Sequence, residues 1–258
     1  SSWALNYSRR IARPNYNSLN PFESQIDELS FQKGNPFLQP QYTDNIKLSH
    51  TYKYRLTTSI GYSYISDFFA QITDTLGTDR NFLITRNIAN QEVWNLSVSY
   101  PFTAAKWWSV YLSLNGYHSS YEGQDDKFVA IDQTTFSFYA QNTFTLPRGF
   151  RFEVSGWFSS PSVWGGTYIT NSMGSLDLGL QKKFLDDKLS VRLSANDVLF
   201  TSRWFADMQF GDLFIDGTGG WESRRVQLNF SYNFGNQEVK NARRRKTGLE
   251  DEDGRVGG

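Results

Sequence analysis

The residues of this sequence that could perform hydrolysis surround one histidine, His118. Ser119 and Ser120 follow it directly, and Asp125 comes shortly afterwards. A serine nucleophile, a histidine base and an orienting carboxylate are the groups that a serine hydrolase combines. These residues lack the glycine-flanked motif that presents such a serine, and closeness in sequence sets no geometry. We therefore expect no catalytic residue and no enzymatic activity.

The sequence also offers little to a metal ion, a cofactor or a nucleic acid. Its only other histidine is His50, and it has no cysteine, whereas metal sites need several such ligands at suitable spacing. The glycine-rich stretch 217–220 lacks the strand–loop–helix context of a phosphate cradle, so we expect a flexible loop end there. The formal net charge is zero, which gives no electrostatic attraction to nucleic acid. We expect no metal, no cofactor and no nucleic-acid partner.

Aromatic side chains between the expected strands are better candidates for ligand binding. The group comprises Trp164, Tyr168, Trp204, Phe205 and Phe214. Loops on a rigid scaffold often carry recognition, and aromatic faces stack on sugars or aromatic ligands. Aromatic residues of a membrane girdle would show the same composition, so both interpretations stay open. From this group we select Trp164, Tyr168 and Trp204 as the expected ligand-binding residues.

The elements that position these residues are strands with one apolar and one polar face. In the segment 225–234 every second residue is apolar, and these residues are Val226, Leu228, Phe230, Tyr232 and Phe234. Successive side chains of a strand point to opposite faces. Apolar residues toward lipid and polar residues toward a lumen are typical of a transmembrane β-barrel. We expect Leu228, Phe230 and Tyr232 to face lipid, and the lumen to be faced by Gln227, Asn229 and Ser231.

The same alternation predicts ten strands along the chain. They cover residues 2–10, 43–52, 55–73, 82–100, 107–121, 128–146, 150–160, 174–184, 188–198 and 221–234. Tight turns are expected at 53–54, 103–106, 147–149 and 186–187, and longer irregular connections at 11–41, 74–81, 122–127, 161–173 and 199–220. Short periplasmic turns and long outer loops are the usual arrangement in outer-membrane barrels. The sequence therefore predicts an all-β, antiparallel, up-and-down transmembrane β-barrel in the outer membrane of a Gram-negative bacterium.

The remaining polar segments fit the same architecture. Charged residues expected in the lumen, where water or a plug would contact them, are Lys47, Arg151, Glu153, Asp177, Lys183 and Arg192. The first connection holds Pro14, Pro21, Pro36 and Pro40, and we expect it to be ordered over the barrel mouth. Residues 235–258 combine a basic run with an acidic one. We expect a barrel over 1–234 and a disordered periplasmic tail over 235–258, with a periplasmic partner or lipid headgroups as its alternative contact.

Several short patches resemble a known family. They are Arg9-Arg10-Ile11-Ala12-Arg13-Pro14, Leu19-Asn20-Pro21-Phe22, the stretch 34–40, Trp221-Glu222-Ser223-Arg224-Arg225, Phe234-Gly235-Asn236 and the stretch 242–252. In order and spacing they resemble the C-terminal half of the barrel of TonB-dependent receptors from Bacteroidetes-type bacteria. The resemblance implies a barrel of about 22 strands, an N-terminal plug domain and energy supplied through a TonB-type protein. Neither a plug, a TonB box nor a signal peptide is visible, so we expect a mature or truncated product and favour truncation.

The leading hypothesis is the barrel wall of an energised outer-membrane receptor that imports a ligand too large for porins. One alternative is a self-contained ten-strand barrel enzyme, a protease or lipase, which would need converging groups near His118. Another is a soluble or surface-adhesion β protein, which would need polar residues on its outer faces. If the ten strands belong to a larger barrel, the first and tenth should not pair with each other.

Overall fold

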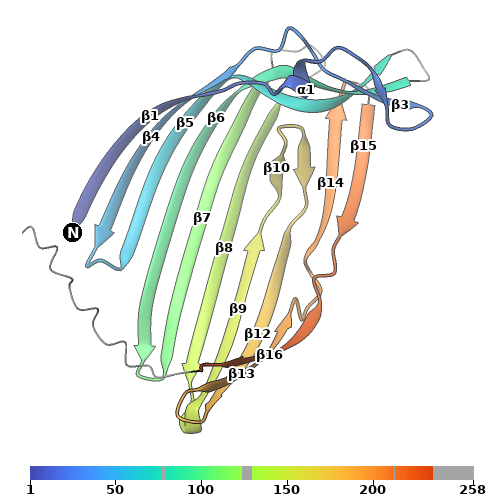
Figure 1. The fold of residues 1–258 in the computed structure, drawn as a ribbon. Helices are drawn as coiled ribbons and strands as arrows, with labels where there is room; N and C mark the ends of the chain where they lie inside the picture. The colour runs from blue at the N-terminus through green and yellow to red at the C-terminus, as the bar shows by residue number, and fades with distance from the viewer. Residues whose placement is uncertain (77–79, 124–129, 212, 235–258) are drawn as a thin grey trace, which may run out of the picture.

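The main sheet is an antiparallel meander of ten long strands. The computed structural model describes residues 1–76, 80–123, 130–211 and 213–234 (Figure 1). In pairing order the strands are β1 (Ser2–Ala12), β4 (Gln41–Tyr52), β5 (Leu56–Leu76), β6 (Arg80–Ala105), β7 (Trp108–Gly123), β8 (Ile131–Thr145), β9 (Phe150–Ser159), β12 (Met173–Phe184), β13 (Leu189–Asn196) and β16 (Arg225–Tyr232). These are the ten strands that the alternation predicts, and the predicted fold class is confirmed. We call this curved array the barrel sheet.

Short turns join the barrel strands at one end of the sheet. Lys53 and Tyr54 connect β4 to β5 with φ angles of 49° and 55°, the left-handed conformation of a tight hairpin turn. The short 3-10 turn η1 (Pro147–Gly149) joins β8 to β9, and Leu185–Lys188 joins β12 to β13. Each of these turns lies at the lower ends of its strands in Figure 1, and the long first connection lies at the top. We call the turn end periplasmic, as in other barrels of this design.

Residues in register across the barrel sheet form alternating apolar and polar rows. One row joins apolar residues from six strands: Leu228, Leu193, Leu180, Phe152, Phe144 and Trp108. The adjacent row, on the opposite face, joins Asn229, Arg192, Gln181, Arg151 and Thr145. Leu228 and Phe230 are 56% and 67% exposed, because no protein layer covers the apolar face. The predicted division of β16 into an apolar and a polar face is confirmed.

The apolar face has about the height of a membrane. On β6 the outward positions of residues 94–102 are Trp94, Leu96, Val98, Tyr100 and Phe102. A membrane-crossing strand needs about 9–11 residues. Charged residues follow directly above Trp94: Glu92 is in register with Tyr64, which in turn pairs with Asp44. This change from apolar to charged residues marks the outer edge of the hydrocarbon region.

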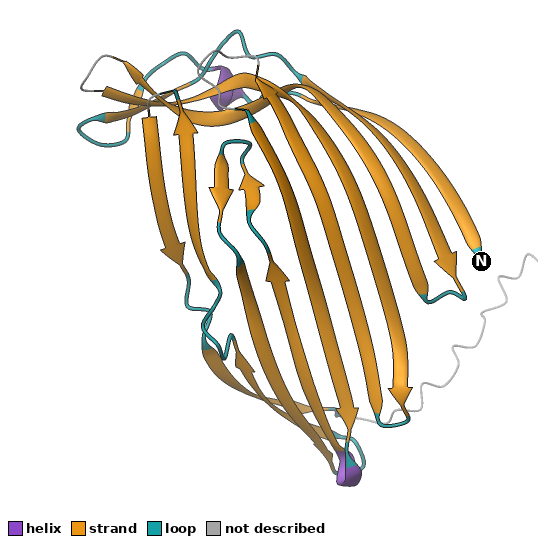
Figure 2. Cartoon of the chain, turned by 180° about the vertical axis from the view of Figure 1, so that it is seen from behind, coloured by secondary structure: helices purple, strands orange, loops and turns teal. Residues whose placement is uncertain are grey.

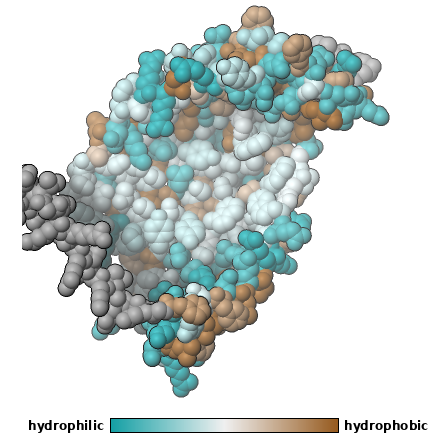
Figure 3. All heavy atoms as spheres, in the orientation of Figure 1, coloured by the Kyte–Doolittle hydropathy of each residue, from teal (hydrophilic) through white to brown (hydrophobic). Residues whose placement is uncertain are grey.

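The barrel sheet is open. β1 and β16 stand at opposite ends of the pairing order, and the two views in Figures 1 and 2 show them at separate edges of the sheet. The prediction that the first and tenth strands do not pair is confirmed for the described residues. The face seen in Figure 3 is hollowed, and its centre is mostly white and teal, the colours of intermediate and hydrophilic residues.

Above the membrane level, β5 and β6 continue as a bent hairpin. The bend follows a bulge between Ile65 and Phe69, where Asp67 has a φ of 54°. We call residues 68–76 and 80–89 the β5–β6 extension. Its length was not predicted, because the sequence suggested an irregular connection over 74–81. No helix among the described residues is long and apolar enough to cross a membrane.

The first long connection is ordered, as predicted, although it is not irregular throughout. It contains α1 (Tyr16–Leu19), β2 (Ser24–Gln25) and β3 (Ser30–Lys33), and β3 pairs in parallel with the outer part of β6. The rings of Phe31 and Phe82 lie 5.7 Å apart across this pair. Asn87 fixes the end of the connection by bonding both the amide and the carbonyl group of Gln39. The connection thus packs on the β5–β6 extension, and its one parallel pair departs from the expected all-antiparallel meander.

Two other connections expected to be irregular form a second sheet. This small sheet consists of β10 (Ser162–Trp164), β11 (Tyr168–Thr170), β14 (Arg203–Phe210) and β15 (Leu213–Gly220). The prediction of a flexible loop end at 217–220 is therefore wrong, since this stretch pairs with β14. Its glycines carry no side chains that alternate, so the sequence pattern hides the strand. The expected tail, 235–258, lies outside the described residues.

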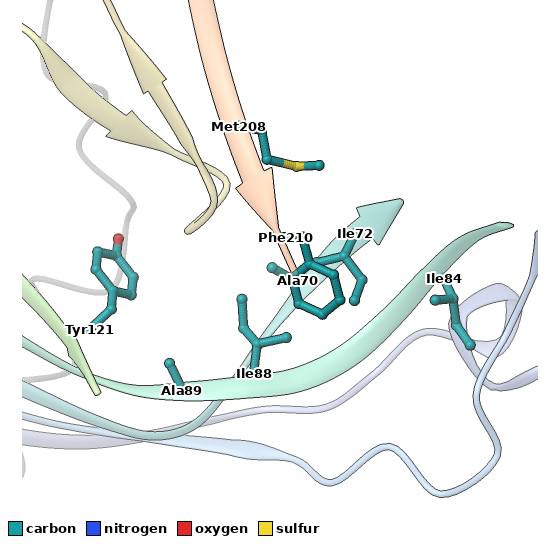
Figure 4. Close-up of a cluster of buried hydrophobic side chains, with 8 residues drawn as sticks. All are labelled: Ala70, Ile72, Ile84, Ile88, Ala89, Tyr121, Met208 and Phe210. Carbon is teal, nitrogen blue, oxygen red and sulfur yellow. The ribbon is translucent and has the colours of Figure 1, made fainter. Parts of the chain in front are cut away.

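The small sheet and the β5–β6 extension enclose an ordinary hydrophobic core. Ile72 and Ile88 are fully buried, and Met208 and Phe210 from β14 pack against them (Figure 4). Tyr121 from β7 closes one side, where its hydroxyl accepts a hydrogen bond from the side-chain amide of Gln91 at 2.8 Å. Burial raises the pKa of Tyr121 to about 12, since the charged form would be desolvated. This core holds the small sheet in place above the barrel sheet.

Candidate ligand site

The short β10–β11 hairpin presents two of the three aromatic residues that the sequence analysis selected. Trp164 and Tyr168 are paired across the hairpin, and their ring centres lie 5.8 Å apart. Gly166 in the turn contacts the ring of Phe68, where a Cβ atom would collide with the aromatic carbons. The hairpin tip is therefore seated on the β5–β6 extension, and the two rings are held beside each other.

The third selected residue, Trp204, lies flat on the neighbouring hairpin of the small sheet. It pairs with Gly219 of β15. A Cβ atom on Gly219 would lie 2.6 Å from the indole ring, so only glycine leaves room for this packing. Gly217 gives the ring similar space at its other edge. The indole ring of Trp204 thus packs directly on the backbone of the glycine-rich stretch.

These three aromatic residues line one cavity, which we call the aromatic cavity. Its volume is about 540 Å³, within the range of small-molecule sites. The complete lining is Trp164, Tyr168, Thr170, Met173, Trp204, Ala206, Ile215 and Gly217. None of these residues is charged. Sequence reasoning missed Ala206 and Ile215, although alternation of Trp204, Ala206, Met208 and Phe210 was a signal for the strand that carries them.

The aromatic cavity adjoins the polar face of the barrel sheet. Its residue Met173 ends a register row of small and polar residues that crosses seven strands: Ser49, Ser59, Ser97, Asn115, Ser137, Ser159 and Met173. This row lies on the face opposite to the lipid-facing aromatic and aliphatic rows. A molecule in the aromatic cavity would therefore stand where the small sheet meets the lumen wall.

The two other aromatic candidates lie elsewhere. Phe205 neighbours Trp204 on β14, and its side chain points to the opposite face. Phe214 is 69% exposed on β15 and does not line the aromatic cavity. Residue type alone could not predict that Phe205 and Phe214 lie outside the cavity that Trp204 lines, since all three residues occur in one connection of the sequence.

Open antiparallel strands with apolar outer rows and polar inner rows are the features of an outer-membrane barrel wall. The model of the outer membrane protein beta-barrel family matches residues 1–232. The chain belongs to this family. No curated protein matched the sequence. Family membership places this outer-membrane β-barrel protein in the outer membrane of a Gram-negative bacterium.

The His118 group lies on the lipid-facing side of this outer-membrane β-barrel protein. His118 is in register with Trp94 at the outer edge of the apolar band. Its Nε2 atom lies 2.8 Å from Asp132 and 3.3 Å from the Ser120 hydroxyl, and its Nδ1 atom lies 2.9 Å from the Thr134 hydroxyl. In a serine hydrolase the serine and the carboxylate contact different ring nitrogens, whereas here both contact Nε2.

The predicted members of that group are separated by the strand geometry. Ser119 is buried on the opposite face from His118, and Asp125 lies outside the described residues. Asp132, which the sequence analysis overlooked, arrives through the β7–β8 register opposite Ser120. Within the described part of the chain, no group of three or more potential metal ligands is assembled.

Charged residues on the polar face of the barrel protein partly neutralise one another. Arg192 forms an ion pair with Glu153 at 3.2 Å, between β13 and β9. Lys183 contacts Asp187 at 3.3 Å near the periplasmic turn. Asp177 accepts hydrogen bonds from the Ser175 hydroxyl and the Asp197 amide, both at 2.8 Å. Lys47 and Arg151 occupy polar-face rows as predicted.

Proposed function

We propose that this protein forms part of the wall of an energised outer-membrane receptor of the TonB-dependent type. The observation that supports the proposal is the position of the aromatic cavity. It lies at the junction of the outer small sheet and the polar lumen wall, where a receptor would capture its ligand before import. A simple pore has no need of a formed aromatic site, because diffusion through a porin requires only a polar channel.

The lining of the aromatic cavity points to the chemistry of the captured group. Trp164, Tyr168 and Trp204 offer flat aromatic faces, and no charged side chain accompanies them in the lining. Sugars and charged ligands depend on several polar or ionised partners for orientation, whereas an apolar ring is stabilised by burial and stacking. We infer that the ligand inserts an uncharged, largely apolar planar group. The remainder of a large ligand would extend into the lumen.

The partners follow from the open sheet and its polar face. In hydrocarbon, the free backbone groups along β1 and β16 require further strands, because a barrel tolerates no open edge in lipid. The resemblance to TonB-dependent receptors supplies the expected complement, a barrel of about 22 strands with a plug domain that a TonB-type protein pulls. The polar rows around Arg192 and Glu153 would then face the plug or lumen water. The apolar rows contact outer-membrane lipid.

We further propose that the protein performs no catalysis. Ser120 shares Nε2 of His118 with Asp132, so the nitrogen that would accept the nucleophile's proton is already paired with a carboxylate. The described β7 and β8 residues around this group also pair as a regular antiparallel ladder. Their backbone amides are therefore used in strand pairing and do not form an oxyanion hole for a hydrolytic intermediate. The arrangement favours a polar anchor at the membrane surface over a hydrolase.

Uptake experiments in cells test the receptor proposal. Cells with and without the full-length protein would be given a defined nutrient mixture, and compounds depleted only by the first strain would be identified. Collapsing the proton gradient with a protonophore should abolish that depletion, while binding to the cell surface persists. Depletion that continues without the gradient would instead indicate an open pore.

A binding experiment tests the aromatic cavity separately. The neutral dye N-phenyl-1-naphthylamine would be titrated into the purified full-length protein in detergent. Replacing Trp164 and Trp204 together by alanine should weaken dye binding, since each stacking contact contributes of order 0.5–1.5 kcal/mol beyond its buried area. Phe214→Ala is the matched control, because this exposed aromatic residue lies outside the cavity. Equal losses in both variants would refute the assignment of the cavity.

A further inference from the structure

Two arginines converge on one aromatic ring at the base of the small sheet. The guanidinium carbon of Arg203 lies 4.2 Å from the centre of the Phe200 ring, and that of Arg224 lies 4.4 Å from it. Both contacts are within the range of cation–π interactions. Arg203 starts β14 and Arg224 immediately precedes β16, so two separate connections bring like charges together. Such an arrangement is stabilised when an anion joins it.

The aspartate below this pair fixes both connections. Asp197 is almost fully buried, and its carboxylate accepts hydrogen bonds from the amides of Thr201 and Ser202 at 2.9 and 3.2 Å. The Ser223 hydroxyl donates a third bond at 2.6 Å, across to the connection that carries Arg224. These three donors occupy the carboxylate from both sides. Asp197 therefore holds the backbone beside the two arginines in place before any ligand arrives.

A cavity opens directly beside the arginine pair. Its volume is about 510 Å³, and its lining includes Arg203, Arg224, Phe205, Thr218, Trp221 and Glu222. Among the described residues, neither arginine lies within ion-pair distance of a carboxylate. Glu222 is the one acidic residue in this lining, so the charges of the lining sum to +1, and the Asp197 carboxylate next to the pair also attracts Arg224. We call it the arginine cavity.

The arginine cavity lies at the level of the outer lipid headgroups. At the other end of β16, the Asn233 amide donates to the Lys188 carbonyl at 2.9 Å, beside a periplasmic turn. From there the eight residues of β16 extend by about 3.3 Å each along a strand tilted by about 40°, which gives a height of about 20 Å in an apolar band about 25 Å tall. Arg224 therefore stands where the strand leaves the hydrocarbon. Trp221 and Phe200 add the aromatic residues that are typical of that interface.

The arginine cavity also faces away from the proposed ligand site. Arg203 and Trp204 are consecutive residues of β14, so their side chains point to opposite faces of the small sheet. The face with Trp204 packs toward the β5–β6 extension and the aromatic cavity. The face with Arg203 is turned away from that core, toward the outer surface of the protein.

We propose that Arg203 and Arg224 bind the phosphate group of a lipid in the outer leaflet. A guanidinium group presents paired N–H donors that match phosphate oxygens, and two such groups neutralise the charge of one phosphate. Trp221 and Phe205 would contact the lipid next to its headgroup. This lipid would anchor the base of the small sheet to the membrane surface, independently of what the receptor imports.

Lipid-binding measurements on the full-length protein test this assignment. Purified protein in detergent would be titrated with phosphorylated lipid A and with the same lipid after enzymatic dephosphorylation. The phosphorylated form should bind at least about tenfold more tightly. The double variant R203Q/R224Q should lose that preference. R225Q is the matched control, because Arg225 of β16 pairs with Asn196 of β13 and does not line the arginine cavity.

Each outcome of this experiment decides the proposal. Equal affinity for the two lipids, or an unchanged preference in R203Q/R224Q, would overturn it. Competition by inorganic phosphate at comparable concentrations would show that free phosphate is the true ligand, and this too would overturn the lipid assignment. A lost preference in R203Q/R224Q with intact dye binding in the aromatic cavity would confirm the site and show that the variant is folded.

Discussion

Apolar and polar residues alternate along the strands of both the barrel sheet and the small sheet. The exposure of the apolar side chains differs between the two sheets. In the barrel sheet the large apolar residues are uncovered, as Phe230 is at 67%. On the face of the small sheet that packs against the β5–β6 extension they are buried, as Phe210 is at 2%. The difference arises from the surroundings, because lipid accepts apolar side chains directly while water drives them into a core. One chain therefore contains a membrane wall and a water-soluble cap within connected strands.

The two sheets also differ in what limits their substitutions. In the core around Phe210, Ile72 and Ile88, each side chain touches protein on all sides, so a lost group leaves a cavity. On the outer face around Leu228, mobile lipid chains can fill any gap. A charge is the more damaging change there, since hydrocarbon offers it no partner. Four predictions separate these regions, in order of decreasing effect.

Truncation in the core should have the largest effect. Phe210→Ala should destabilise the small sheet by about 3–5 kcal/mol, because the transfer and cavity terms add. Hydrogen exchange of the β14 and β15 amides in the full-length protein would measure this loss. Phe230→Ala on the lipid-facing side is the matched control and should cost much less. Similar losses in the two variants would contradict the division into a packed core and a lipid face.

Charge insertion in the membrane region should have the next largest effect. Leu228→Arg should destabilise the barrel by about 2–4 kcal/mol if the residue lies near the bilayer midplane. Asn229→Arg, one residue further along on the polar face, should have little effect. Refolding titrations of the full-length protein in lipid vesicles would compare them. Equal destabilisation would argue against the lipid and lumen assignment of the two faces of β16.

Glycine substitutions should produce a smaller change that is confined to the aromatic cavity. Gly219→Ala places a Cβ atom 2.6 Å from the Trp204 indole, so the ring must move. We expect a shift in tryptophan fluorescence and several-fold weaker binding of N-phenyl-1-naphthylamine. Gly220→Ala is the control, because its Cβ atom would meet its nearest neighbour at 3.6 Å, an ordinary contact. Unchanged dye binding in Gly219→Ala would remove Trp204 from the ligand site.

Removing the histidine at the membrane surface should have the smallest effect. His118→Ala breaks the contacts with Asp132 and Thr134, which are exposed and contribute little to stability. Ligand depletion by cells should stay the same, and phospholipid or peptide hydrolysis should be absent with either protein. A hydrolytic activity that disappears with His118 would support the barrel-enzyme alternative.

The sequence alone determined the barrel strands. Alternation with a period of two depends only on local residue order, and in a membrane wall each strand has the same two surroundings along its length. The faces of β16 and the tight turn at Lys53 and Tyr54 were therefore predictable. Residue type also singled out Trp164, Tyr168 and Trp204, which line one cavity in the structure, and their role in ligand binding stays a prediction.

Only the tertiary structure decided how the outer connections are used. The glycines of β15 show no alternation in the sequence. They pack against Trp204 only because β15 pairs with β14, the strand that carries this residue. Asp132 reaches His118 through the β7–β8 register. Arg203 and Arg224 both lie over the Phe200 ring, in two connections that Asp197 holds together. Such contacts join residues far apart in the chain. The local sequence pattern indicates to which face of a strand a side chain points. Which distant residue that side chain contacts depends on the packing of the whole molecule.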